Sequence, residues 1–351
     1  MNDNKVNLEN LLLSYYIKYD NLFTLCNSTL TNINSNSVDI YIDLYDMLKP
    51  IYTRDVYATK KYLITSSVIN LAAHLRNYFW TRHRLSTRIF LVYGACTSSN
   101  HKQFYPTFGD DKFRQTVNYR KNDILVLSQL KLAKLLVGYI NDVYFISKSI
   151  NFSIISYDNI IKNPRTPAIL ITKSKYAYQI PSLLNNVVIF RPKKSNGKDV
   201  SYAVTKSNVY YKFFSKASQD TILAMQNLNP SLLSLIIAMN GLSSYNMNSI
   251  ININTAIKML NNAISNNKIV NDYNSDINFV YNNIQDMHKF IDNISFEYRF
   301  YTVDLLTQFR IYNSTAEARD VSWIINLNDP NTIKEINNKY FADNPLDLNS
   351  L

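Results

Sequence analysis

The sequence predicts an α/β fold in which helices flank a parallel β-sheet. Ala168–Ile171 is a short, wholly apolar run, typical of a strand buried on both faces of a parallel sheet. Val38–Leu44 alternates apolar and polar residues as a strand does, and Arg88–Gly94 is a further core strand. Between these two, Lys60–Leu85 has apolar residues three to four positions apart, the spacing of a helix packed on one face. Strands that alternate with helices indicate parallel pairing through helical crossovers.

The composition is that of a folded protein with an excess of positive charge. Of the 351 residues, 46% are hydrophobic and 13% aromatic, and the formal net charge is +11. Such a charge favours a polyanionic partner, and nucleic acid before a membrane. The alternative is that the lysines are only solvated, and the net charge by itself does not separate the two.

Several classes of protein are disfavoured by residue counts. Five glycines leave no Gly-rich phosphate loop. Cys26 and Cys96 lie far apart with no Cys or His at ligand spacing, which argues against a zinc site or a disulfide framework and for a reducing compartment. No run of 18 apolar residues occurs, and the first ten residues are too polar for a signal peptide. We therefore expect a soluble, cytoplasmic protein with no membrane partner.

The order of several short motifs resembles the flap endonuclease (5′-nuclease) family in its phage-type form. Thr172–Tyr176 stands where that family has Thr-Gly-Asp-Lys-Asp after its central strand, and Phe104–Phe108 keeps the family's motif after the second strand. Pro230–Gly241 and Thr255–Leu260 resemble the helices around its helix–three-turn–helix. The resemblance spans residues 38–306. It implies a PIN-like, twisted parallel sheet flanked by helices, followed by a helical DNA-binding region.

The resemblance also implies a division of the chain into four parts. These are an N-terminal helical extension and linker (1–37), the PIN-like α/β domain (38–215), the helix–three-turn–helix-like region (216–306), and a C-terminal extension with a terminal helix (307–351). Within the α/β domain, Val187–Pro192 is predicted to be an edge strand and Tyr202–Val204 its return. Thr205 is predicted to cap the helix that follows.

Family members hold Mg²⁺ or Mn²⁺ with carboxylates from several strand ends, but most matched positions here are neutral. Asp43 is the best match to the first ligand, and Asp158, in a segment expected at a helix N-terminus, is the other surviving acid. Two nearby divalent ions need several negative charges to offset their repulsion. We therefore expect no metal cofactor and no catalytic residue at the vestigial positions Asp43, Gly94, Asp158, Ser174, Tyr176 and Tyr245. Neutral residues also stand at Ser156, Asn159 and Leu242. An alternative is that Tyr176, Tyr178 and Tyr245 simply fill the emptied site.

Three groups of residues are predicted to contact DNA. Residues 109–134 match the family's arch over single-stranded DNA, although a solvated helical face is the alternative; the predicted contacts there are Lys112, Arg114, Arg120 and Lys121. Lys173 and Lys175 bracket the central turn. Asn252 and Asn254 replace glycines of the family's phosphate-binding turn, where asparagine tolerates positive φ, and Thr255 and Lys258 follow. Contacts of this kind read DNA structure rather than sequence.

The favoured hypothesis is a catalytically inactive 5′-nuclease homologue that binds DNA, with a role in phage DNA replication in the host cytoplasm. Protein partners of phage origin are open. One alternative is a structural or interaction protein, such as a virion or replication-assembly component, that reuses the fold. The other is an active 5′-nuclease whose metal ligands lie elsewhere in the chain.

Overall fold

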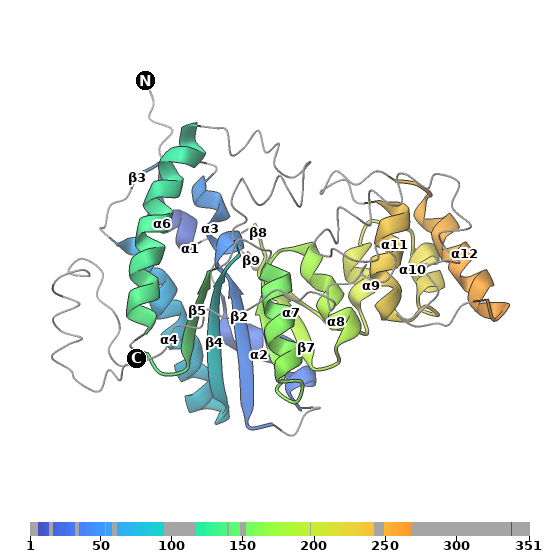
Figure 1. Cartoon of the computed structure of the whole chain (residues 1–351), viewed down its shortest axis with the longest axis horizontal. Helices are drawn as coiled ribbons and strands as arrows, with labels where there is room; N and C mark the ends of the chain where they lie inside the picture. The colour runs from blue at the N-terminus through green and yellow to red at the C-terminus, as the bar shows by residue number, and fades with distance from the viewer. Residues whose placement is uncertain are drawn as a thin grey trace.

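A six-stranded sheet, in the order β10-β7-β6-β2-β4-β5, forms the centre of the computed structural model (Figure 1). Five neighbouring strands are parallel, and β10 joins the edge antiparallel to β7. The predicted α/β class is therefore confirmed. The strands are β2 (Ser37–Asp43), β4 (Ser86–Tyr93), β5 (Val143–Ser147), β6 (Ala168–Ile171), β7 (Val187–Arg191) and β10 (Tyr202–Val204). The structure describes residues 6–13, 17–31, 35–52, 54–57, 62–94, 117–138, 140–147, 152–196, 198–241, 249–268 and 338.

The strand order reverses between β2 and β6. The chain starts the sheet at β2, extends it through β4 to β5, and then returns to β6 on the other side of β2. Open α/β sheets bind ligands outside the carboxyl ends of the strands at such a switch point. The β2–β6 register ends with Ile42 opposite Ile171, so the next residues, Asp43 and Thr172, lie at the same level of that edge.

The face of the sheet that carries Ile40, Ile42, Ile169 and Ile171 is covered by five helices. All four isoleucines are fully buried because parallel strands bury both faces. The helices are α1 (Leu8–Leu13), α2 (Tyr19–Thr31), α3 (Leu44–Tyr52), α4 (Leu63–His83) and α6 (Val117–Val137). Two short strands, β1 (Val6–Asn7) and β3 (Val56–Tyr57), pair with each other.

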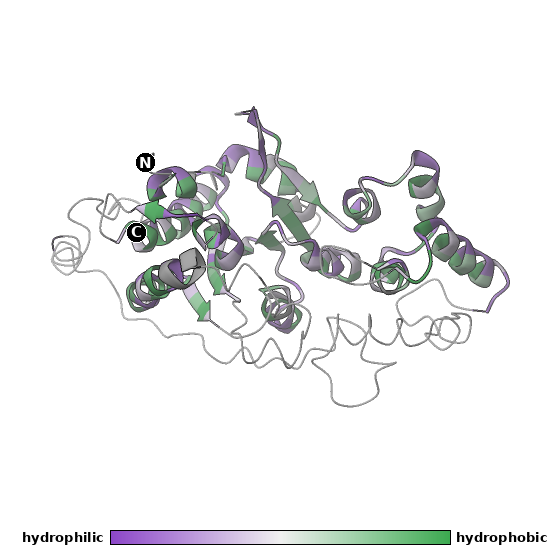
Figure 2. Ribbon diagram, turned by 90° about the horizontal axis from the view of Figure 1, so that it is seen from above, coloured by the Kyte–Doolittle hydropathy of each residue, from purple (hydrophilic) through white to green (hydrophobic). Residues whose placement is uncertain are grey.

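The opposite face, which carries Tyr41, Val92 and Leu170, is covered by the later helices. The last of these continue away from the sheet as a helical region (Figure 1), whose helices carry both hydrophobic and hydrophilic residues (Figure 2). They are α7 (Phe152–Lys162), η1 (Lys175–Tyr178), α8 (Gln179–Leu183), α9 (Val209–Phe213), α10 (Gln219–Met225), η2 (Pro230–Leu232), α11 (Leu233–Asn240) and α12 (Ile253–Ser265). A small hairpin, β8 (Lys194–Ser195) and β9 (Lys198–Asp199), joins β7 to β10.

Two local predictions were wrong. Val187–Arg191 is not an edge strand, because the return strand Tyr202–Val204 pairs with it and takes the edge. Thr205 does not cap the following helix, which begins at Val209. The Asn208 side chain accepts a hydrogen bond from the Thr205 backbone N–H (2.9 Å) and closes a turn there, and the helix begins three residues later than predicted.

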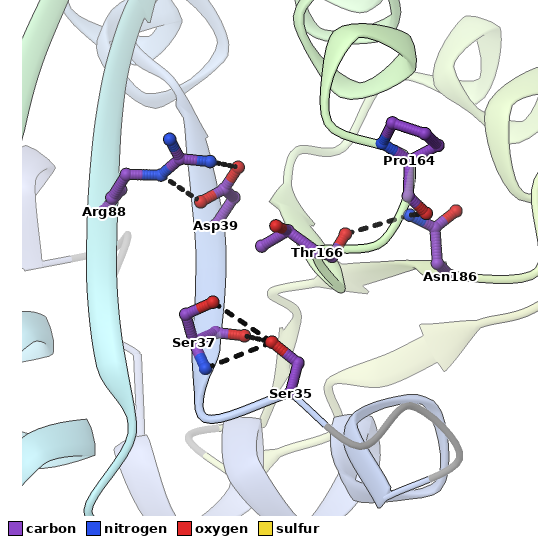
Figure 3. A network of polar contacts seen from close by, with 7 residues as sticks. All are labelled: Ser35, Ser37, Asp39, Arg88, Pro164, Thr166 and Asn186. Carbon is purple, nitrogen blue, oxygen red and sulfur yellow. Dashed lines mark hydrogen bonds and ion pairs between the residues drawn. The ribbon is translucent and has the colours of Figure 1, made fainter.

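Polar contacts hold the amino ends of the strands in register (Figure 3). Arg88 on β4 donates two hydrogen bonds to Asp39 on β2, at 2.8 and 2.7 Å. Asn186 donates to the carbonyls of Pro164 (3.1 Å) and Thr166 (2.9 Å) and thereby ties the loop before β6 to the start of β7. Burial raises the pKa of Asp39, and the hydrogen bond and charge of Arg88 oppose that rise.

Replacing Arg88 with Met should destabilise the fold by about 2–4 kcal/mol, because it leaves the buried Asp39 carboxylate without its partner. The value lies below that for a fully buried pair because the Arg88 side chain is 34% exposed. Urea unfolding of Arg88→Met and of the double variant Asp39→Asn/Arg88→Met measures the effect. The double variant should be more stable than Arg88→Met alone, since no buried charge remains. A double variant that is no more stable than Arg88→Met contradicts this account.

The first turn of α4 is capped from a distant helix. Tyr62, which precedes α4, has φ 60° and offers no side-chain cap. The Gln129 side chain on α6 instead accepts hydrogen bonds from the N–H groups of Ile64 (2.8 Å) and Thr65 (3.3 Å). These two hydrogen bonds fix α4 against α6 where both helices cover the sheet.

Replacing Gln129 with Ala should cost about 1–3 kcal/mol of folding free energy, because two buried N–H groups lose their acceptor. Chemical denaturation of the variant checks this. Ser128→Ala, which removes an exposed hydroxyl one residue away on the same helix, is the matched control. Equal unfolding midpoints for the two variants would show that Gln129 does not cap α4.

Candidate functional site at the carboxyl edge of the sheet

Two hydrogen bonds to carboxylates join the carboxyl ends of β2 and β6. The Thr172 hydroxyl donates to Asp43 Oδ2 (2.8 Å), and the Lys173 backbone N–H donates to Asp46 Oδ2 (2.6 Å). Asp43 ends β2, Asp46 lies in the first turn of α3, and the other two residues follow β6. The switch point of the sheet is therefore closed by polar contacts that the protein makes with itself.

The local sequence explains why the two carboxylates face β6 together. Asp43 immediately precedes α3, and its Oδ1 accepts a hydrogen bond from the Asp46 N–H (3.0 Å), as an N-cap residue does. This spacing of three places both acids at the first turn of the helix. The Thr172 hydroxyl also accepts from the Ser174 N–H (3.0 Å), so the turn after β6 is bonded both to itself and to α3.

Burial changes the proton affinity of both carboxyls. Burial, and then the charge of Asp46, raises the pKa of Asp43 to about 8, against the opposing effect of its hydrogen bonds. Burial also raises the pKa of Asp46, which the Lys173 N–H and the Lys173 charge counter. Asp43 thus tends to hold a proton near neutral pH, and the negative charge at the switch point is less than two carboxylates would suggest.

Three cations, Lys173, Lys175 and Arg191, lie at this edge of the sheet. Arg191 is the last residue of β7, and its Nη1 donates to the Tyr178 hydroxyl (3.0 Å). Lys175 Nζ donates to the Phe213 carbonyl (2.7 Å) and lies 5.2 Å from the centroid of the Phe213 ring. Burial, with the charge of Arg191 as a further cause, lowers the pKa of both Lys175 and Lys173. The edge therefore holds more cationic groups than acids.

Aromatic rings flank this polar cluster on both sides. Tyr93, the last residue of β4, shares a hydrogen bond of 2.6 Å with the Tyr52 hydroxyl, and both rings are buried. On the β7 side, Tyr176 and Tyr178 are buried, and the Tyr178 hydroxyl lies 3.2 Å from that of Tyr202. The strand end next to the predicted position Gly94 is thus occupied by a hydrogen-bonded tyrosine pair.

The structure brings some of the predicted site residues together and separates others. Asp43, Lys173 and Ser174 meet at the switch point through the bonds of Thr172 and Asp46. Asp158 does not lie at a helix N-terminus: it is in the second half of α7 and pairs with Lys162 (3.0 Å) one turn later. Ser156 and Asn159 are on the same helix. Outside the described residues lie Lys112, Arg114, Leu242 and Tyr245, and the side chains of Arg120 and Lys121 on α6.

The predicted turn before α12 has a different conformation from the one expected. Asn252 has φ −69°, not a positive value, and its side chain accepts a hydrogen bond from the Thr255 N–H (2.9 Å) as the N-cap of α12. Asn254 also lacks a positive φ, and its side chain accepts from the Thr221 hydroxyl on α10. These residues begin a helix and link it to a neighbour. Lys258 is exposed on α12, at the far end of the helical region from the sheet (Figure 1).

Sequence reasoning did not select Arg191 or the Tyr52–Tyr93 pair. Arg191 had a detectable signal, because the carboxyl ends of neighbouring parallel strands meet at one edge and Arg191 ends the strand after Ala168–Ile171. The tyrosine pair had none, since its members are 41 residues apart and meet only through the packing of α3 on β4.

The residues at this edge do not fit a two-metal centre. Carboxylate oxygens that a cation would need already accept hydrogen bonds from Thr172 and from the backbone of Lys173 and Asp46. In the part of the chain that the structure describes, no three or more His, Cys, Asp or Glu residues gather so as to hold a metal ion. The cations Lys173 and Arg191 would in addition repel a divalent ion.

Comparisons with known proteins concern the fold. No family model and no curated protein sequence matches the chain. The fold is similar to that of bacteriophage T5 5′-nuclease structures. One is the T5 5′-exonuclease with bound zinc, at 13% identity and a TM-score of 0.45. Another is a T5 flap endonuclease in a pseudo-enzyme–product complex with DNA and metal ions, at 13% identity and a TM-score of 0.44. Each alignment covers 78% of this chain and 96% of the other.

Among the described helices, none is long and apolar enough to cross a membrane.

Replacing Asp43 with Asn should flatten the dependence of stability on pH between about 4 and 8. In this window the folded state keeps a proton on Asp43 that the unfolded chain has released, so the wild-type free energy of unfolding falls as pH rises. The amide cannot titrate, and it can still accept from the Asp46 N–H. Unfolding midpoints in urea at pH 5 and pH 8 measure the change.

The matched control is Asp199→Asn, because the pKa of Asp199 is lowered and its contribution changes only at more acidic pH. The free energy of unfolding of Asp43→Asn, measured as a difference from wild type, should therefore be higher at pH 8 than at pH 5. For the control, the same difference should be equal at the two pH values. An Asp43→Asn variant with the wild-type slope would rule out a proton held at this position.

Proposed function

We propose that the chain is a catalytically inactive relative of the 5′-nucleases that binds DNA and does not cleave it by a metal-dependent route. The observation that supports this best is the closed switch point. Asp43 and Asp46 accept hydrogen bonds from the turn after β6, next to Lys173 and Arg191. A pair of acids held in this way stabilises the strand ends and leaves little negative charge for cations.

Phosphodiester hydrolysis by two metal ions depends on the negative charge of the site. In two-metal hydrolysis the ions hold the attacking and leaving oxygens, so the protein must first bind two divalent ions a few Å apart. Hard cations of this kind need several anionic oxygen ligands. The sequence positions that resemble the family's ligands carry Gly94, Ser174 and Tyr176 in place of acids.

DNA binding is supported by charge and its placement. The net charge of +11 favours a polyanion, and Lys173, Lys175 and Arg191 lie together at the edge of the sheet. Contacts from such groups go to phosphates, so the affinity depends on DNA structure and salt more than on base sequence. By the resemblance, we place this role in phage DNA replication.

One observation favours a second candidate, a structural or interaction protein that reuses the fold. The Tyr52–Tyr93 pair and the rings of Tyr176 and Tyr178 are buried beside the switch point, as in a core that has replaced a site. A protein of this kind needs stability at that edge and no affinity for DNA.

Incubation with a 5′-flap DNA and Mg²⁺ or Mn²⁺ tests the absence of cleavage. We expect the substrate to remain intact over hours at neutral pH. Cleavage by the wild type that is lost in Asp43→Ala would instead establish an active nuclease that uses the surviving carboxylate. Because loss of the N-cap lowers stability by about 1 kcal/mol, the folded state of Asp43→Ala is checked by circular dichroism.

Fluorescence anisotropy with labelled flap, duplex and single-stranded DNA tests binding. We expect affinity to fall steeply as salt rises, with a log–log slope of about 0.7–0.9 per phosphate contact, and similar affinities for unrelated sequences of the same structure. Lack of binding to all three DNAs at low salt would reject the DNA-binding proposal and favour the structural candidate.

A further inference from the structure

We propose that the edge between β6 and β7 is a phosphate site in which Arg191 and Lys175 bind a phosphate group of a nucleic-acid strand without a divalent ion. This inference rests on the proposed DNA binding and adds the place of contact and its independence from metal. A metal centre requires several acids, whereas this edge carries more cations than acids. The inference follows from that difference.

Arg191 is positioned for such a role by the strand that it ends. The Thr172 N–H donates to the Phe190 carbonyl (3.3 Å), so Arg191 stands directly beside the turn that closes the switch point. Its Nη1 donates to the Tyr178 hydroxyl, and its guanidinium carbon lies 5.9 Å from the Tyr178 ring centroid. One nitrogen is thus held by protein, while the fork of the remaining N–H groups matches the oxygens of a phosphate.

Lys175 lies at the same edge and is held by contacts with α9. One of its three ammonium donors goes to the Phe213 carbonyl at the end of α9, and the ammonium lies over the Phe213 ring. Two donors remain for a ligand. Lys216, three residues after Phe213, is exposed and close enough for its charge to act on Lys175.

Arg191 and Lys175 are cations without a carboxylate bonded to them in the described part of the chain. Within the described ranges, neither Arg191 nor Lys175 forms an ion pair with a carboxylate, and Asp46 is the acid whose charge interacts with Arg191. Burial together with the charges of neighbouring cations lowers the pKa of the Lys175 ammonium. Half-buried cations that repel one another are stabilised by an anion placed between them. A phosphate carries that charge and enough oxygens to accept from both side chains.

The cationic edge makes binding independent of divalent ions. The guanidinium and the ammonium are positive groups of the chain itself, so no metal ion needs to be recruited before the phosphate binds. Mg²⁺ would compete for the phosphate and would weaken binding slightly, as any added salt does.

The experiment measures the affinity of the full chain for labelled single-stranded oligonucleotides in EDTA and in Mg²⁺ at equal ionic strength. We expect no loss of affinity in EDTA. Oligonucleotides with a 5′-phosphate and with a 5′-hydroxyl identify the source of the phosphate. Tighter binding of the phosphorylated strand assigns the site to a terminal phosphate, and equal binding assigns it to the phosphodiester backbone.

Variants locate the contact. Arg191→Gln and Lys175→Gln should each weaken binding roughly tenfold, the effect of losing a hydrogen bond to a charged group, and should reduce the salt slope by about 0.7. Arg191→Lys, which keeps the charge but not the fork, should recover part of the loss. Arg165→Gln is the matched control, because Arg165 is exposed on the loop before β6, at the opposite edge of the sheet.

Three outcomes have distinct meanings. Binding that EDTA abolishes and Mg²⁺ restores overturns the inference but leaves DNA binding intact. The same holds if Arg191→Gln and Lys175→Gln bind as tightly as Arg165→Gln while thermal unfolding shows all three folded. A wild-type chain that binds no oligonucleotide at low salt instead removes the proposed function on which the inference rests.

Discussion

The hydrogen bond between Thr172 and Asp43 is the contact on which the arrangement of the carboxyl edge depends. It joins β2 to β6 where the strand order reverses, so the two strands that start the two halves of the sheet are bonded at their ends. Because Thr172 is held there, the Lys173 N–H donates to Asp46 and the Ser174 N–H donates back to the Thr172 hydroxyl. One hydroxyl thus sets the path of the chain into η1 and, through it, the positions of Lys175 and Tyr178.

Charge at this edge follows from that geometry. Asp43 is buried because it is bonded to β6, and burial favours its protonated form. The backbone turn that binds Asp46 carries Lys173, and the neighbouring strand ends in Arg191. The charges of Lys173 and Arg191 therefore act on Asp46, and the charge of Lys49 acts on both acids. The same residues that close the strand ends also give the surface beside them a positive character.

The fold could be predicted where its signals are local. The apolar run Ala168–Ile171 and the alternation of Val38–Leu44 identified β6 and β2, and the spacing in Lys60–Leu85 identified α4. Pairing could be predicted only in part. Tyr202–Val204 was expected to return beside Val187–Pro192 and does pair antiparallel with β7, but the return strand, not Val187–Arg191, takes the edge of the sheet.

The candidate site could be predicted only in part, for a related reason. Strand ends can be read from sequence, and Asp43, Lys173 and Ser174 are strand-end residues that meet as expected of a parallel sheet. Asp158 was misplaced because the start of α7 at Phe152 puts it in the body of a helix.

Asn252 illustrates how one residue type serves two different backbone roles. An asparagine in place of glycine was read as a residue for positive φ, but the same side chain is also a strong N-cap in extended backbone. The sequence shows the asparagine, and only the start of α12 decides between the two. A capped helix exposes to a ligand the side chains of its first turn, here Thr255. A glycine-containing turn would expose backbone N–H groups instead.

A cluster of cations and a cluster of acids respond to ligands in opposite ways. A cluster of acids is destabilised by mutual repulsion until cations bind, so its folded state is strengthened by metal. Arg191 and Lys216 each repel Lys175 instead, and the free energy of that repulsion is recovered when an anion binds beside Lys175. Because the hydrogen bonds of Asp43 and Asp46 hold the strand ends without any ligand, the edge remains intact when no anion is present. Stability of the sheet and the proposed affinity for phosphate therefore rest on different residues, and a substitution at Arg191 should lower the second with little effect on the first.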